Sequence, residues 1–125
     1  MSNPNIVAVT SILGKADELI PANATSNVLL ANNTGSNTVL KINQIVAANV
    51  DGSSAVNTTV AINSTAAGGG TSFPIVSTVS VPADASLIVV DKTTAIYLEE
   101  NKSITVQSGT ASKIAYTISY EIIAS

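Results

Sequence analysis

The chain has 125 residues and a net charge of −3 from eight acidic residues and five lysines, and it contains no histidine, cysteine, tryptophan or arginine. These absences remove the imidazole base, the thiolate nucleophile or metal ligand, and the guanidinium clamp for phosphate. Only 10% of the residues are charged, against about 25% in an average domain, and the scattered lysines form no basic stripe for nucleic acid. The length fits one domain.

The first strand is predicted over Ile6–Leu13, and its start, Ile6–Val9, is apolar on both faces. Such a strand is either buried on both sides or covered on one side by another subunit. Because a chain end stays ordered only when something holds it, the two explanations weigh about equally. We therefore expect residues 1–13 to form a strand or arm and residues 14–125 to form one domain. The expected partner contacts are Ile6, Val7, Val9 and Leu13.

Short strands and turn signals alternate through the middle of the chain. Residues 16–19 are compatible with one helical turn, which Pro21 would end. Further strands are predicted over residues 28–31, 39–48 and 56–63. The dipeptide Asp51-Gly52 is typical of a hairpin turn, because both residues tolerate positive φ. A calcium loop starting at Asn49 is disfavoured, because the later ligands of such a loop are missing.

The glycine run Gly68–Gly70 predicts a mobile hairpin loop, since a phosphate-binding loop would continue with Lys and Ser or Thr. Strands are then expected over residues 75–81, 87–90, 96–99 and 104–107. Residues 87–90 are apolar on both faces. For them, burial within the core is favoured over contact with another subunit, because short apolar runs often lie in a core.

The last segment, KIAYTISYEII, has the clearest period of two. One of its faces carries Ile114, Tyr116, Ile118, Tyr120 and Ile122. Tyr116 and Tyr120 are therefore predicted to lie in the core rather than to bind a ligand. With Tyr97 they are the only tyrosines available for an aromatic carbohydrate platform.

Neither pair of adjacent acids, Asp17-Glu18 or Glu99-Glu100, suits acid–base catalysis, because neighbouring residues of a strand point to opposite faces. Both pairs are predicted to be solvated turn acids. The pattern as a whole predicts an all-β antiparallel sandwich, Ig-like or jelly-roll, with eight or nine short strands and no substantial helix. No residue is assigned to catalysis, a cofactor or a metal, and the chain is expected not to be an enzyme.

Two long stretches carry a resemblance to a known class. Val39–Ile62 reads VLKINQIVAANVDGSSAVNTTVAI, and Val79–Gly109 combines Val-Pro-Ala, an apolar strand and Ile-Tyr-Leu-Glu-Glu. With the closing strand Ile118–Ile123, they resemble small tailed-bacteriophage, cyanophage-like virion structural proteins of the capsid decoration or cement type. Asn101 stands where that pattern usually has glycine, and Asn also tolerates positive φ.

The resemblance implies a β-sandwich without catalytic residues that assembles in many copies on a particle. It further implies binding to a major capsid protein or other virion proteins and a dimeric or trimeric homo-oligomer. Independently of the resemblance, no nucleic-acid partner is expected because the lysines are scattered, and no membrane partner because no apolar run exceeds four residues. The expected location is the virion, after synthesis in the host cytoplasm, since MSNPNIVAV lacks the pattern of a secretion signal. A neck or tail accessory protein and a carbohydrate-binding or adhesion module are the alternatives.

Overall fold

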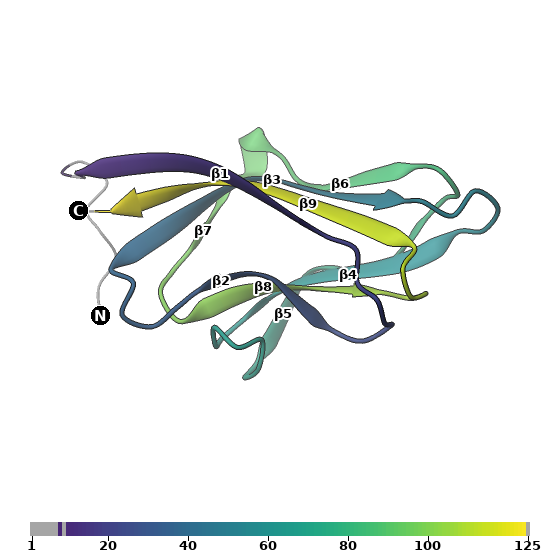
Figure 1. Cartoon of the computed structure of the whole chain (residues 1–125), viewed down its shortest axis with the longest axis horizontal. Coiled ribbons are helices and arrows are strands. Elements are labelled where there is room, and N and C mark those ends of the chain that lie inside the picture. The colour runs from purple at the N-terminus through teal and green to yellow at the C-terminus, as the bar shows by residue number, and fades with distance from the viewer. Residues whose placement is uncertain (1–7, 9, 125) are drawn as a thin grey trace.

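Antiparallel strands dominate the computed structural model, which describes residue 8 and residues 10–124 (Figure 1). Within that part of the chain the strands are β1 (Ser11–Leu19), β2 (Asn27–Asn32), β3 (Thr38–Asn49), β4 (Val56–Asn63), β5 (Ser72–Val81), β6 (Ser86–Val90), β7 (Ile96–Leu98), β8 (Lys102–Ser108) and β9 (Ile114–Ala124). One 3-10 turn, η1 (Lys92–Thr94), follows β6. No helix of membrane-spanning length and hydropathy occurs in the described residues.

The strands form two sheets that face each other (Figure 1). Sheet A has the order β1-β9-β3-β6, with β7 also paired to β3, and sheet B has the order β2-β8-β4-β5. The pairs are nested along the chain: β4 with β5, β3 with β6 and β7, β2 with β8, and β1 with β9. One long hairpin wound around itself gives this nesting, which is the jelly-roll arrangement. The predicted antiparallel sandwich is therefore confirmed, and its topology is jelly-roll rather than Ig-like.

The core lies between the two sheets and takes side chains from both. On β9 the predicted alternation is confirmed as far as Tyr120, since Ile114, Tyr116, Ile118 and Tyr120 are all buried. Near the end of the strand it fails, because Ile122 is only half-buried whereas Ile123 is buried. On β3 a bulge between Ile42 and Gln44 shifts the register. That extra residue lets Ile42 and Ile45, which are three positions apart, both face the core. From sheet B the interior includes Val56, Val60, Ile104 and Val106.

The first described strand differs from its prediction. Residues 16–19, compatible in sequence with a helical turn, are extended in β1 and pair with β9. A free edge on β9 supplies a complete set of backbone partners, and this tertiary pairing overrides the local preference for helix. The predicted end of the N-terminal arm, after residue 13, falls inside β1.

The Asp51-Gly52 turn is not a hairpin turn, which corrects the sequence interpretation. It connects β3 in sheet A to β4 in sheet B. The Asp51 carboxylate accepts hydrogen bonds from the amides of Ser53 (2.9 Å) and Ser54 (3.3 Å). The residues of this turn thus determine that the chain reverses, but they do not determine which sheet the next strand joins.

Strand β6 is an edge strand that pairs only with β3, so the predicted burial on both faces is wrong. Its Ile88 side chain is 58% exposed. A short apolar run has the same appearance in sequence whether it lies at the edge or the centre of a sheet.

The glycine run Gly68–Gly70 does lie in a hairpin, between β4 and β5. The loop is held against sheet B rather than projecting freely. The Asn63 side-chain amide donates to the Gly68 carbonyl (2.7 Å), and the Ser103 hydroxyl donates to the Thr65 carbonyl (2.8 Å).

Candidate assembly surface

The adjacent acids have structural partners, and neither pair converges on a common site. On β1, the Asp17 carboxylate accepts a hydrogen bond from the Tyr120 hydroxyl at 2.9 Å, whereas Glu18 lies on the other face of the strand. These two residues are therefore strand residues, not the turn acids predicted from sequence.

The second acidic pair fixes loops. The Glu100 carboxylate accepts hydrogen bonds from the backbone amides of Gly35 (2.6 Å) and Asn37 (3.3 Å), which tethers the β2–β3 loop. Glu99 forms an exposed ion pair with Lys102 at 3.2 Å. Among the described residues no group of three or more His, Cys, Asp or Glu side chains lies close enough to hold a metal ion.

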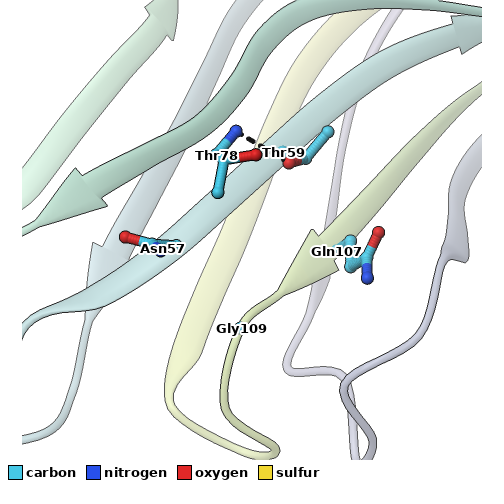
Figure 2. A pocket seen from close by; sticks show the side chains of 5 residues that line it. All are labelled: Asn57, Thr59, Thr78, Gln107 and Gly109. Carbon is cyan, nitrogen blue, oxygen red and sulfur yellow. Dashed lines mark hydrogen bonds between the residues drawn. The ribbon is translucent and has the colours of Figure 1, made fainter.

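A small depression on sheet B is lined by neutral polar groups (Figure 2). It lies among Asn57 and Thr59 of β4, Thr78 of β5, Gln107 of β8, and Gly109. The Thr59 hydroxyl accepts a hydrogen bond from the Thr78 amide at 2.9 Å, which supports the positive φ of Thr78. The lining offers amides and hydroxyls but no ionisable group, so it supplies no acid, base or activated nucleophile.

Two of the three tyrosines are core residues, as predicted. Tyr116 and Tyr120 are buried on β9, whereas Tyr97 on β7 is 48% exposed. Burial, together with the Asp17 carboxylate, raises the pKa of Tyr120 to about 12, and burial also raises the pKa of Tyr116. An aromatic carbohydrate platform built from the three tyrosines is therefore not formed.

Two neighbouring apolar side chains are exposed at the start of β1, and Phe73 on β5 and Ile88 on β6 are exposed to the same extent. Leu13, the one predicted contact residue within the described part of the chain, is 58% exposed, and its neighbour Ile12 is 57% exposed. The predicted contacts Ile6, Val7 and Val9 lie outside the described residues. Sequence reasoning missed Ile12, because only the topology reveals that β1 is a sheet edge with both faces open at this end.

The pairing of β1 with β9 runs to the end of the described chain, where the Thr10 amide donates a hydrogen bond to the Ala124 carbonyl at 2.8 Å. Ser11 lies opposite Ala124, and each residue up to Leu19 has its own partner on β9. Ala124 is the last residue of β9, and the described ladder begins there. This end of the molecule thus combines an open strand edge, two exposed apolar side chains and an adjoining segment of apolar sequence.

Solved structures of other proteins show distant similarity to this chain, and two of them come from a spore appendage and a virus. No protein-family model and no curated protein matches the chain. A subunit of the disulfide-linked pili that form Bacillus endospore appendages is 16% identical, with a TM-score of 0.49, and the match covers 94% of this chain and 95% of that one. A chain from the structure of infectious bursal disease virus, Gt strain, is 6% identical, with a TM-score of 0.40. That match covers 93% of this chain but only 31% of the viral one. Neither similarity identifies a function for this chain.

Proposed function

We propose that the chain is a non-enzymatic virion structural protein, a capsid decoration or cement protein that binds and stabilises the major capsid lattice. Jelly rolls occur in viral capsid domains but also in lectins and cupins, so the fold leaves the choice open. What favours a structural role is the combination of dispersed acids, a pocket without ionisable groups and exposed apolar residues on the edge strands, Ile12 and Leu13 of β1 among them.

The observation that carries this proposal is the exposure of Ile12 and Leu13 on the edge strand β1. The apolar run Ile6–Val9 adjoins these residues in the sequence. An apolar segment with β-branched side chains gains stability by pairing with another strand or by covering an apolar surface. In this proposal the arm of residues 1–9 lies on a neighbouring subunit, and Ile6, Val7 and Val9 make the contact.

The mechanism is added contact area repeated over a lattice. A specific protein interface removes on the order of 1,000 Å² or more from water. On a capsid, many such contacts act together, so that modest individual affinity gives strong overall retention. Only 10% of the residues are charged, which agrees with contact mainly through shape and apolar area.

The test removes the arm and keeps β1. A variant lacking residues 2–9 retains all nine pairs between β1 and β9, and we expect it to fold but to lose binding to purified capsids of the encoding phage. The matched control lacks residues 2–5, which removes polar residues and preserves Ile6–Val9. We expect the control to bind as the full chain does. If the variant lacking residues 2–9 binds capsids as well as the full chain does, the contact assigned to the arm is wrong. If the full chain itself does not bind capsids, the proposed function is wrong.

A neck or tail accessory role is the second candidate from the same class. Copy number per particle distinguishes the two roles, because a decoration protein scales with the capsid lattice whereas a neck or tail protein forms a small closed ring. Quantitative mass spectrometry of purified particles measures this number.

A further inference from the structure

Among the edges of the two sheets, β1 is the one that is both long and regular. It pairs with β9 over nine consecutive residues without a register shift. The edge strands β2, β5 and β6 are paired through ladders that contain register shifts, and β7 has only three residues. Bulges and shortness discourage the addition of another strand, whereas a long regular edge invites it.

The sequence around this edge is complementary to itself in the antiparallel sense. It reads Ile12-Leu13-Gly14-Lys15-Ala16-Asp17-Glu18-Leu19-Ile20, with Lys15 and Asp17 placed symmetrically about Ala16. We infer that two copies of this chain pair along β1, antiparallel, across a two-fold axis at Ala16. Lys15 then lies opposite the second copy's Asp17.

The same register matches the apolar residues. Leu13 lies opposite the second copy's Leu19, and Ile12 lies opposite the second copy's Ile20. Three of these four side chains are about half exposed in the single chain: Ile12, Leu13 and Ile20. The pairing covers them and continues sheet A from one copy into the other. A two-fold axis repeats every contact, as in most homodimers.

The charged groups are available for this pairing. Lys15 is exposed, and the one ion pair among the described residues joins Lys102 to Glu99 instead. Asp17 uses its Oδ2 atom to accept from Tyr120, which leaves Oδ1 free to accept from the lysine. Directly opposed residues on antiparallel strands have Cβ atoms about 4.5–5.5 Å apart, within reach of an ion pair. The second copy is favoured over an unrelated strand, because an unrelated strand would match both the charges and the apolar residues only by coincidence.

This inference goes beyond the proposed capsid role and does not depend on it, since it needs neither residues 1–9 nor a capsid. The first test exchanges charges. Lys15→Glu places an acid opposite an acid at the pairs of positions 15 and 17, and Asp17→Lys places a lysine opposite a lysine at the same pairs. We expect each variant alone to dimerise about tenfold or more weakly than the native chain. An equimolar mixture should form a heterodimer, because the glutamate introduced in one variant then faces the lysine introduced in the other, and the retained Asp17 faces the retained Lys15.

Light scattering after size-exclusion chromatography and native mass spectrometry measure these species. Lys92→Glu makes the same change in net charge at an exposed position of η1 and is the matched control, which should dimerise like the native chain. A native chain that stays monomeric at high micromolar concentration overturns the inference. So does a mixture that gains no heterodimer when both variants are folded.

A cysteine cross-link tests the register even if Asp17→Lys fails to fold. The native chain has no cysteine, so any disulfide of Ala16→Cys joins two copies. Opposed Cα atoms lie about 4.5–5.5 Å apart, inside the range of about 4.4–6.8 Å for disulfides. Glu18→Cys is the control, because its counterpart in the second copy lies four residues away, about 13 Å along the strand. We expect rapid dimerisation of Ala16→Cys and slow dimerisation of Glu18→Cys, and equal rates for the two would overturn the register.

Discussion

The hydroxyls of Tyr116 and Thr58 share a hydrogen bond across the core, which joins β9 of sheet A to β4 of sheet B. The Tyr116 hydroxyl also donates to the Gln107 carbonyl of β8 at 3.0 Å. Both side chains are almost completely buried. Since a phenol has one proton, Tyr116 donates to Gln107 and accepts from Thr58, so neither hydroxyl lacks a partner.

This pair predicts non-additive stability. Tyr116→Phe and Thr58→Val should each lower the free energy of unfolding by about 1–3 kcal/mol, because each leaves a buried polar group without its partner. The double variant should lose less than the sum of the two single losses, since it removes both hydroxyls together. Urea denaturation of the four proteins measures the cycle. Tyr97→Phe is the exposed control, and strictly additive losses would contradict the pairing.

Stability should fall at alkaline pH because of Tyr120. Its pKa is raised to about 12 in the folded chain, against about 10 in an unfolded one, so the folded state holds this proton more tightly. The resulting stability is fully present below about pH 10 and is lost as the pH rises towards 12. Tyr120→Phe should give a shallower decline, measured as urea midpoints between pH 9 and 11.5. An unchanged slope would count against a buried, protonated Tyr120.

Acidic pH should destabilise the two turns that the carboxylates of Asp51 and Asp91 hold by hydrogen bonds. Hydrogen bonds from the Ser53 amide and hydroxyl lower the pKa of Asp51, and those from the Thr93 hydroxyl and amide lower the pKa of Asp91. Each carboxylate adds to the free energy of unfolding at pH values above its pKa in the unfolded chain, which is near 3.8. This stabilisation is lost as the pH falls through the lower pKa of the folded chain. Asp51→Asn and Asp91→Asn keep an acceptor but cannot titrate. Thermal melts between pH 7 and 2 should therefore show a smaller acid loss for the double variant, and identical curves would refute this account.

The β4–β5 hairpin depends on a glycine at position 68. A Cβ atom there would lie 2.8 Å from the Val28 Cγ2 atom, and the φ of Gly68 is +84°. We expect Gly68→Ala to lower the free energy of unfolding by about 1–3 kcal/mol through both the clash and the backbone strain. Gly69→Ala is the matched control, because its Cβ would have its nearest contact at 3.5 Å. Equal stability of the two variants in urea denaturation would disprove the close packing of this loop on β2.

Local sequence patterns predicted the strands better than they predicted strand partners. The alternation of apolar residues correctly marks the strands Val56–Asn63 and Ile114–Ala124, because a period of two has a direct structural meaning. Towards the end of both strands the burial no longer alternates. The Asp51-Gly52 dipeptide predicted a reversal of the chain correctly, but not the change of sheet that follows it. Turn residues set backbone angles locally, whereas the choice of sheet depends on the nested pairing of the whole chain.

The exposed contacts were harder to predict than the core. Leu13 was expected to contact a partner, whereas Ile12 and Ile88 were not singled out as exposed residues, because a side chain's exposure depends on whether its strand lies at an edge. The partner of Tyr120, Asp17, is more than one hundred positions away in the sequence, and only the pairing of the first described strand with the last brings them together.

The irregular edge at β5 disfavours aggregation by the addition of further strands. Pro74, two register shifts and the left-handed backbone of Thr78 interrupt the row of hydrogen-bonding groups along that side. An incoming strand finds no straight template there. This side of sheet B is therefore a poor template for the growth of a fibril.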